Sequence, residues 1–410
     1  MAQFDLDYIR RQFPAFRTPS LIGQAFFENA GGSYMCQPVI NRFQRYFEQR
    51  KVQPYYAFEA SKEAGAEMDL APVRFARYLN VEADEVLFGP STSQNTYVLS
   101  QSIRERISGD SSIIVSGQEH EANSGVWRNL AQYGIEVRIW PVDKTDGRLH
   151  LAKLEPLLDD SVRLVAMTHC SNLVGEINPV RKVADLTHQM GALLLVDGVS
   201  YCPHGLPDVD ALGADIYLFS TYKTYGPHQG VMVLRKSARH LLAPQAHFFN
   251  HKNPSKWMVP AGPDHAQVAA ANGIIDYFDA LDAHHGGEDD NERPRRVEKL
   301  LREAEAPHIE TMLDYLISRN DIRLIGPSNH KNRAPTISFT ADKISSTEIG
   351  KKLADEGIMA GAGHYYAARL LSEMGLEPNM GAVRLSFLHY TSGDEINHAI
   401  AALDKILNSD

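Results

Sequence analysis

Seven short apolar runs alternate with helix-like segments between residues 85 and 235, and this alternation restricts the possible folds more than any other feature. The runs are residues 85–89, 112–117, 137–142, 164–170, 192–198, 215–220 and 230–235. Several are almost continuously apolar, as is typical of strands covered on both faces. Strands that alternate with helices predict a largely parallel α/β sheet.

The remainder of the chain has a different pattern, which predicts a smaller α+β domain. The expected helices are 181–191 within the sheet region, then 266–283, 287–319, 346–356 and a last helix that begins at Ser392, where Glu395 has capping-box spacing. The expected strands are 321–326, 335–340 and 382–388. We therefore expect a large α/β domain over residues 25–272 and a small domain made of residues 1–24 and 273–410.

Composition and charge exclude several classes of partner. The formal net charge of −10 disfavours nucleic acid and anionic membranes, which require a basic face. No stretch reaches 18 apolar residues, and the first residues lack the layout of a secretory signal. The three cysteines are scattered, so we expect no disulfide framework and no metal site. These features favour a cytoplasmic protein.

Polar residues follow several of the predicted strands. In open α/β sheets, ligands bind beyond the carboxyl ends of the strands, so these residues are expected around one crevice. They are Ser91, Thr92, His120, Asn172, Asp197, Ser220, Tyr222 and Lys223.

The chemistry of this set matches pyridoxal 5′-phosphate. Lys223 offers an amine for the aldehyde, and Asp197 offers a carboxylate for the protonated pyridine nitrogen. Ser91 and Thr92 open a helix that can receive the phosphate. Taken singly, each residue also has a structural interpretation: an exposed loop lysine, a turn or cap aspartate, and a plain helix cap.

The chain resembles the class V aminotransferase family of fold-type I pyridoxal-phosphate enzymes, in its cysteine desulfurase-like branch. The resemblance rests on the blocks FFENAGG (26–32), GPSTSQN (89–95), EHEANSGVW (119–127), SNLVGEINPV (171–180), VDGVS (196–200), FSTYKTYGP (219–227), GAGHYYA (361–367) and AVRLSF (382–387). It implies a large domain with a mainly parallel seven-stranded sheet, a smaller α+β C-terminal domain and a homodimer.

The resemblance also implies roles for single residues. Lys223 forms the Schiff base, Asp197 pairs with the pyridine nitrogen, His120 stacks on the ring and Asn172 reaches the phenolate oxygen. The phosphate is expected to contact Ser91, Thr92, Ser220 and Tyr222, with Tyr222 standing where desulfurases usually carry histidine. Ser200 stands where many relatives have glutamine.

On the substrate side, the resemblance implies Arg384, Asn29, His364 and Tyr366. A bidentate guanidinium suits the α-carboxylate of an amino acid, and a surface or interface salt bridge is the alternative for Arg384.

The substrate side departs from the desulfurase pattern. Tyr366 occupies the position of the cysteine that carries a persulfide, and Gly361 and Ala362 replace an arginine. Segment 259–267 lacks the threonine that relatives lend to the phosphate of a neighbouring subunit. Of the cysteines, Cys36 is the one we consider as an active-site thiol.

The expected reaction passes through an external aldimine and a Cα carbanion, with Lys223 moving the proton. We expect a cysteine desulfurase-like C–S lyase without the persulfide cysteine. One alternative is a class V aminotransferase or an amino-acid epimerase. A second alternative is a catalytically silent protein of the same fold that serves as a binding partner.

Overall fold

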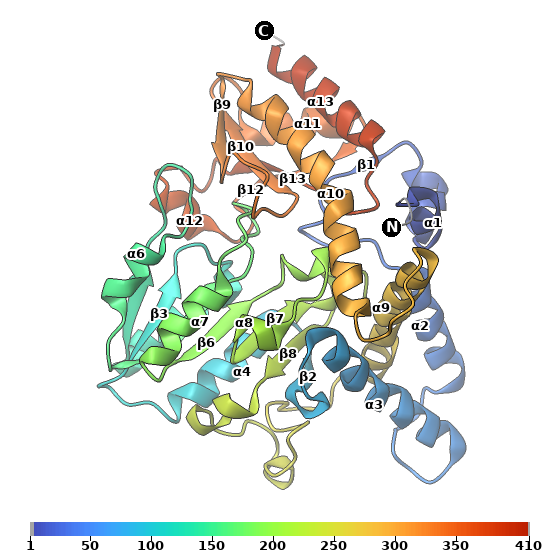
Figure 1. Ribbon diagram of the computed structural model, residues 1–410, viewed down its shortest axis with the longest axis vertical. Helices are drawn as coiled ribbons and strands as arrows, with labels where there is room; N and C mark the ends of the chain where they lie inside the picture. Colours follow the sequence, from blue (N-terminus) through green and yellow to red (C-terminus); the bar gives the residue numbers. More distant parts are fainter. Residues whose placement is uncertain (1–3, 409–410) are drawn as a thin grey trace.

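The structure is a computed structural model that describes residues 4–408, and it is built around a seven-stranded sheet (Figure 1). The strand order is β2-β8-β7-β6-β5-β3-β4, in which the neighbours from β7 to β4 are parallel and β8 is antiparallel to both β7 and β2. The strands are Val86–Gly89 (β2), Ser112–Ser116 (β3), Glu136–Trp140 (β4), Val162–Thr168 (β5), Leu193–Asp197 (β6), Ile216–Ser220 (β7) and Gly230–Leu234 (β8). Each lies within or overlaps a predicted run, so the mainly parallel sheet is confirmed.

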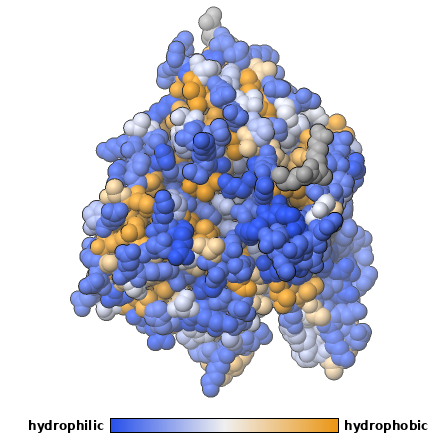
Figure 2. All heavy atoms as spheres, viewed as in Figure 1, coloured by the Kyte–Doolittle hydropathy of each residue, from blue (hydrophilic) through white to orange (hydrophobic). Residues whose placement is uncertain are grey.

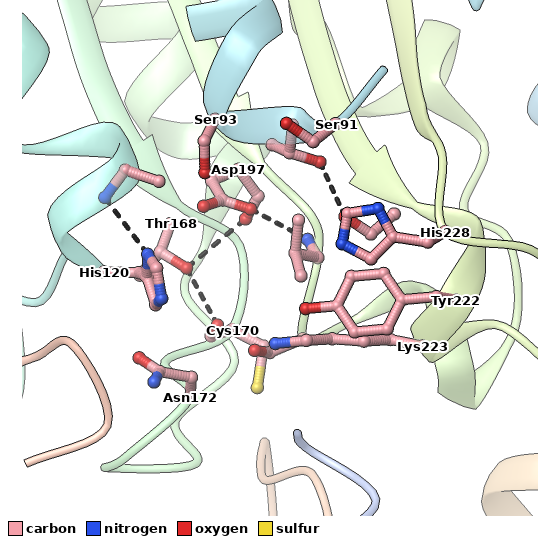
Figure 3. A pocket seen from close by; sticks show the side chains of 15 residues that line it. Ser91, Ser93, His120, Thr168, Cys170, Asn172, Asp197, Tyr222, Lys223 and His228 are labelled. Atoms are coloured by element: carbon pink, nitrogen blue, oxygen red, sulfur yellow. Dashed lines mark hydrogen bonds between the residues drawn. The ribbon is translucent and has the colours of Figure 1, made fainter. Parts of the chain in front are cut away.

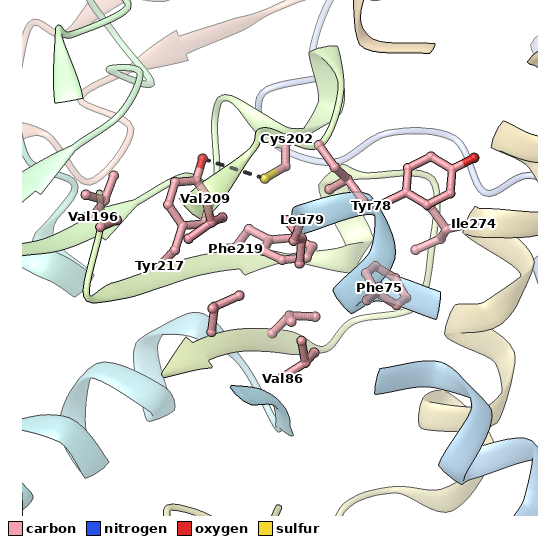
Figure 4. Close-up of a cluster of buried hydrophobic side chains, with 14 of the residues drawn as sticks. Phe75, Tyr78, Leu79, Val86, Val196, Cys202, Val209, Tyr217, Phe219 and Ile274 are labelled. Atoms are coloured by element: carbon pink, nitrogen blue, oxygen red, sulfur yellow. Dashed lines mark hydrogen bonds between the residues drawn. The ribbon is translucent and has the colours of Figure 1, made fainter. Parts of the chain in front are cut away.

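Both faces of this sheet are buried, which explains why its strands are apolar at successive positions. In β7, Tyr217 and Phe219 pack in one hydrophobic cluster, part of which is drawn in Figure 4, while Ile216 and Leu218 pack in another. The helices of the first 285 residues are Leu6–Arg11 (α1), Gln37–Gln49 (α2), Glu59–Leu79 (α3), Thr92–Arg104 (α4), Gly125–Arg128 (α5), Leu151–Leu154 (α6), Val180–Gln189 (α7), Val209–Leu212 (α8) and His265–His284 (α9).

A second, four-stranded antiparallel sheet has the order β12-β13-β10-β9. Its strands are Ile322–Ile325 (β9), Thr336–Ala341 (β10), Gly361–Gly363 (β12) and Ala382–Ser386 (β13), and the short strands Ala25–Phe26 (β1) and Ile358–Met359 (β11) pair beside it in parallel. The later helices are Arg293–Ile317 (α10), Ser346–Asp355 (α11), Ala368–Glu373 (α12) and Gly393–Asn408 (α13). This part has the mixed α+β character that the sequence predicts.

The predicted capping box of the last helix is present. The Ser392 amide donates to Glu395 Oε2 at 2.8 Å, and the Glu395 amide donates to Ser392 Oγ at 3.2 Å. These reciprocal bonds satisfy two amides at the start of α13, and they fix where the helix begins.

The N-terminal segment contacts both sheets. Ile9 and Phe13 belong to the hydrophobic cluster that includes one face of the large sheet, whereas Ala25 and Phe27 pack in the cluster of the small sheet. The division into residues 25–272 and residues 1–24 with 273–410 stays a proposal.

The surface is dominated by hydrophilic residues on the face shown in Figure 2, with hydrophobic residues in separate patches between them. Within residues 4–408, no helix combines the length and the hydropathy that crossing a membrane requires.

Candidate active site

A cavity of about 160 Å³ lies beyond the carboxyl ends of β5, β6 and β7 (Figure 3). Strand-end residues converge here because parallel strands end at the same edge of the sheet. All nine residues that the sequence assigned to the cofactor line this cavity: Ser91, Thr92, His120, Asn172, Asp197, Ser200, Ser220, Tyr222 and Lys223.

Lys223 lies in a short 3₁₀ turn that follows β7, and only 6% of its surface is exposed. Within residues 4–408, no hydrogen bond or ion pair is made by its amine. Burial and, to a smaller extent, the charge of Arg384 lower the pKa of this amine to about 8, against the opposing effects of Asp197 and Glu28. The structure therefore places Lys223 in a buried site and not in a solvated loop, and it favours the neutral, nucleophilic form of the amine.

Asp197 is the last residue of β6, and its carboxylate is held at the floor of the cavity. Its Oδ1 accepts a hydrogen bond from the Val199 amide at 2.9 Å. No donor among the described residues bonds Oδ2, which leaves this oxygen as an acceptor for a ligand. Burial raises the pKa of Asp197, while the Val199 amide and Lys223 oppose that shift.

A group of hydroxyls lies at the N-terminus of α4. Thr92 Oγ1 and Ser220 Oγ are 2.8 Å apart, and Ser91 caps the helix by accepting from the Gln94 amide at 3.1 Å. β8 comes very close to this helix start, because a Cβ added to Gly230 would lie 2.4 Å from the Ser91 carbonyl carbon. Hydroxyls and helix amides together suit an anion such as phosphate.

His120 and Asn172 lie on the other side of the cavity. His120 Nδ1 accepts from the Ala122 amide at 3.1 Å, and burial lowers the pKa of this imidazole to about 4, with smaller effects from Lys223 and Arg384. The ring is therefore neutral near pH 7. Asn172 donates to the Tyr365 carbonyl at 2.9 Å, while its own side-chain oxygen is buried without a partner.

Arg384, on β13, is buried and reaches toward this region from the small sheet. Its Nη1 donates to the Asn172 carbonyl at 3.1 Å, its Nη2 bonds the carboxylate of Glu28, and its Cζ lies 3.8 Å from the centre of the Tyr365 ring. Arg384 also acts electrostatically on Lys223 and His120. Its interactions are internal, so the structure does not place it in a surface salt bridge.

The other residues expected on the substrate side are placed differently. The Asn29 amide group donates to Phe26 and Ser386 carbonyls at 3.2 and 3.1 Å and accepts from Tyr390, so its side chain is fully used within the fold. Asn29 lines a small neighbouring cavity that Lys223 also lines.

His364 and Tyr366 are exposed, and neither lines the main cavity. The Tyr366 ring nevertheless lies 5.1 Å from the His120 ring, and His364 Nδ1 accepts from the Tyr366 amide at 3.1 Å. Both residues lie outside the cavity: Tyr366 contacts its border through His120, and His364 contacts Tyr366.

Several residues at the site were not predicted. His228 lines the cavity and stacks on Tyr222, with ring centres 4.8 Å apart. It follows Lys223 by five residues and comes directly after the block 219–227, which was the available signal. Glu28 and Tyr365 surround Arg384, and each adjoins a residue that was predicted.

The cysteines also differ from expectation. Cys170 lines the cavity, whereas Cys36 is buried elsewhere, with its Sγ 3.7 Å from the Gly273 carbonyl. Burial raises the pKa of both thiols to about 12. Neither thiol is therefore an activated nucleophile at neutral pH. Among residues 4–408, no group of three or more His, Cys, Asp or Glu side chains is arranged to bind a metal ion.

The chain is similar to known proteins over almost its whole length. The sequence profile of the aminotransferase class-V family matches residues 25–398. An aminotransferase-like protein, FGM3 from Gibberella zeae, is 33% identical over 99% of both chains, and a cysteine desulfurase from Cronobacter sakazakii is 28% identical over 98% of both. The fold matches an apo cysteine desulfurase from Thermococcus onnurineus NA1 with a TM-score of 0.87, at 20% identity and 99% coverage of each chain.

Enzymes of this family use pyridoxal phosphate, and the residues present fit that group. Among the described residues, the Lys223 amine, one Asp197 carboxylate oxygen and the Asn172 amide oxygen have no hydrogen-bond partner, and hydroxyls lie at a helix start; these features carry the fit. When bound, the cofactor withdraws electrons from the Cα atom of an attached amine. The chain thus belongs to the aminotransferase class-V family, and it is a pyridoxal-phosphate-dependent enzyme of fold type I.

Proposed function

We propose that the enzyme acts on an amino acid by moving the Cα proton, and that Lys223 first binds the cofactor aldehyde and then carries this proton. The observation that supports this best is the buried amine of Lys223, which has no hydrogen bond or ion pair within residues 4–408. A lysine with a pKa of about 8 is partly neutral near neutral pH, so it can serve both as a nucleophile and as a general base.

The remaining residues hold the cofactor and the substrate in this proposal. Asp197 Oδ2 accepts from the pyridine nitrogen and keeps it protonated, and neutral His120 lies against the ring. Arg384 binds the α-carboxylate of the substrate.

The phosphate is assigned to the set of side-chain hydroxyls at the N-terminus of α4. Ser91, Thr92 and Ser220 surround the N-terminus of this helix, and Tyr222 and Ser200 line the cavity beside them. Asn172 is assigned to the phenolic oxygen of the cofactor.

We further propose that the reaction is C–S cleavage without a persulfide-carrying cysteine. Tyr366 stands at the border of the cavity where that cysteine is expected, and all three cysteines are buried. Elimination from cysteine removes the Cα proton, breaks the Cβ–S bond and, with one water consumed, yields sulfide, pyruvate and ammonia. No protein thiol takes part in that balance.

Transamination is the second candidate, and the name of FGM3, an aminotransferase-like protein, favours it. Transamination leaves the amino group on the cofactor as pyridoxamine phosphate, whereas elimination leaves the cofactor unchanged. Sulfide and pyruvate formed from cysteine support the lyase. Persistent pyridoxamine phosphate with a range of amino acids contradicts it.

The assignment of Lys223 has its own test. Borohydride reduction of the holoenzyme, followed by peptide mass spectrometry, is expected to fix the cofactor on Lys223. Lys223→Ala is expected to lose this adduct and at least about a thousandfold in turnover, since it removes both the covalent attachment and the base. Lys236→Ala, which changes an exposed lysine, is the matched control. An adduct on another lysine, or full activity of Lys223→Ala, would overturn the assignment.

A homodimer and a cytoplasmic location also belong to this proposal. Exposed aromatic side chains gather in the loops that contain Tyr55, Tyr56, Phe248 and Phe249, which supports a contact between two copies. The three cysteines form no disulfide, which suits a reducing compartment. Sedimentation of the purified protein tests the dimer.

A further inference from the structure

The arginine assigned to the substrate carboxylate already has a carboxylate partner. Arg384 is buried, with 3% of its side chain exposed, and its Nη2 bonds Glu28 while its Nη1 donates to the Asn172 carbonyl. Of its three nitrogens, Nε has no partner among residues 4–408. Two of the three guanidinium nitrogens are therefore engaged before a substrate arrives. A substrate carboxylate binds a guanidinium best through two parallel N–H groups, so it needs one of these two nitrogens.

The local backbone leaves room for the Glu28 carboxylate. A Cβ on Gly31 would lie 2.6 Å from Glu28 Oε1, and a Cβ on Gly361 would lie 2.9 Å from Oε2. A side chain at either position would push the carboxylate away. The backbone of Glu28 also bridges to Ser386 on β13, which holds Glu28 beside the strand that carries Arg384. Two glycines and a strand contact thus define this position.

Polar atoms around Arg384 are left without partners. They are Glu28 Oε2, Asn172 Oδ1, Tyr365 Oη and Arg384 Nε, all of them buried. An unsatisfied buried polar atom is costly, and most such atoms in proteins find a partner. Four of them around one guanidinium indicate a place where a ligand completes the hydrogen bonds.

We propose that Glu28 occupies Arg384 in the substrate-free enzyme and gives it up to the α-carboxylate of the amino acid. This inference rests on the proposed function, which assigns Arg384 to that carboxylate. Two carboxylates on one guanidinium repel each other, so one must leave when the substrate binds. Glu28 is the partner that can leave, because 31% of its side chain is exposed.

Glu28 is therefore a specificity-determining residue. Glu28 keeps the buried charge of Arg384 paired. A ligand must therefore bind Arg384 more strongly than Glu28 does before it can take its place. A carboxylate that binds the freed Nη2 together with the unpaired Nε gains enough to displace Glu28, whereas an amine without a carboxylate gains nothing from Arg384. The opposite arrangement, in which Glu28 binds a donor group of the substrate, predicts the opposite effect of removing its charge.

A matched pair of amines tests the proposal on the holoenzyme. 2-Aminoisobutyrate has no hydrogen on Cα, so it replaces Lys223 on the cofactor without the proton transfer that follows. Isopropylamine has a hydrogen in place of the carboxylate, so its binding is read from the initial change in absorbance, before any transfer of that hydrogen. The affinity of each is measured from the visible absorbance of the cofactor in the wild type and in Glu28→Gln.

Glu28→Gln is expected to bind 2-aminoisobutyrate about tenfold more tightly, because its amide competes more weakly for Arg384. Isopropylamine is expected to bind unchanged. Glu28→Ala, a second variant in case the first misfolds, shifts the same affinity in the same direction. Glu121→Gln removes a charge of the same sign from an exposed pair with Arg369, and it is expected to change neither affinity.

The outcomes separate this inference from the proposed function. Unchanged or weaker binding of 2-aminoisobutyrate by Glu28→Gln, with normal binding of isopropylamine, overturns the role of Glu28 alone. An Arg384→Gln variant that binds both amines as the wild type does overturns the assignment of Arg384, and the inference with it. A wild type in which neither amine alters the cofactor spectrum overturns the proposed function as a whole.

Discussion

Lys223 and Arg384 are both buried and close enough to interact electrostatically, and the protonation of Lys223 depends on the charged groups beside it. Burial and Arg384 lower the pKa of Lys223, while Asp197 and Glu28 raise it. Since the neutral amine is the form that attacks an aldehyde, this balance sets the pH at which Lys223 reacts.

The pKa of Lys223 can be measured in the cofactor-free protein. The rate at which Lys223 binds pyridoxal phosphate is expected to rise with pH and to level off above about 8, more than two pH units below an ordinary lysine. Arg384→Gln removes a positive charge and shifts the midpoint upward, whereas Asp197→Asn removes a negative charge and shifts it downward. Stopped-flow absorbance gives the midpoint, and a midpoint near 10 in the wild type would contradict the placement of Lys223.

At the scale of single residues, the sequence predicted the site residues that lie at the end of a strand. Asp197 and Lys223 follow continuous apolar strands, so their positions could be predicted from the strands alone. Glu28 could not, because its position depends on Arg384, which lies 356 residues away in the chain. Tyr365 and Tyr366 adopt left-handed conformations, with φ of 49° and 58°, which tyrosine seldom does and which no sequence pattern signals.

At the scale of elements, the contact between β8 and the N-terminus of α4 positions the side-chain hydroxyls of the site relative to the sheet. β8 begins at Gly230, which pairs with Gly89 of β2 and packs against the backbone of Ser91 and Thr92. A side chain at Gly230 would overlap main-chain atoms that have no freedom to rotate away. The position of the helix start therefore depends on the absence of a side chain in the neighbouring strand.

Gly230→Ala is expected to move the start of α4 and to weaken the binding of pyridoxal phosphate by about tenfold or more. The overlap also lowers the free energy of unfolding by about 1–3 kcal/mol. Gly262→Ala is the matched control, because a Cβ there meets no atom within 4 Å. Equilibrium dialysis of the cofactor-free variants measures the affinity, and equal affinities for the two variants would contradict this account.

Helices and strands were predicted best where an element is buried on two faces, because its sequence then contains few polar residues. Six of the seven strands of the large sheet satisfy that condition, the edge strand β4 being the exception, and all seven were predicted. Helices α2 and α3 had no counterpart among the predicted elements. Each buries only one side, as with Val39 and Tyr46 in α2, so each lacks a continuous apolar run.

At the scale of the whole molecule, a buried aromatic cluster joins distant parts of the chain. His389 lies between the hydroxyls of Tyr277 and Tyr225, at 2.6 and 3.4 Å, and Phe13 and Tyr390 pack edge-on in the same cluster. Tyr225 is two residues from Lys223. The cluster thus links the N-terminal segment, helix α9 and the C-terminal region to the turn that carries Lys223, the proposed catalytic residue.

This cluster predicts a loss of stability in acid. Burial lowers the pKa of His389 to about 3, whereas the unfolded chain binds a proton near pH 6.5. The unfolded state therefore holds more protons between these values, and the stabilisation present above pH 6.5 is lost as the pH falls toward 3.

His389→Gln keeps a polar side chain but does not titrate. Below pH 6.5 its free energy of unfolding is expected to fall less steeply than that of the wild type, by up to about 1.4 kcal/mol per pH unit. Urea unfolding of both proteins between pH 4 and pH 7 measures the difference, and parallel curves would contradict the prediction.

The pairing of β1 with β11, and of Glu28 with Arg384, has a consequence for biosynthesis. A nascent chain emerges from the ribosome N-terminus first, so residues 25–28 wait for partners that are translated more than 300 residues later. The strands that present Asp197 and Lys223 are all synthesised by residue 234, well before that moment. The half of the cavity assigned to the vitamin-derived group can thus assemble during translation, whereas the half assigned to the substrate is completed only after β13 has been synthesised.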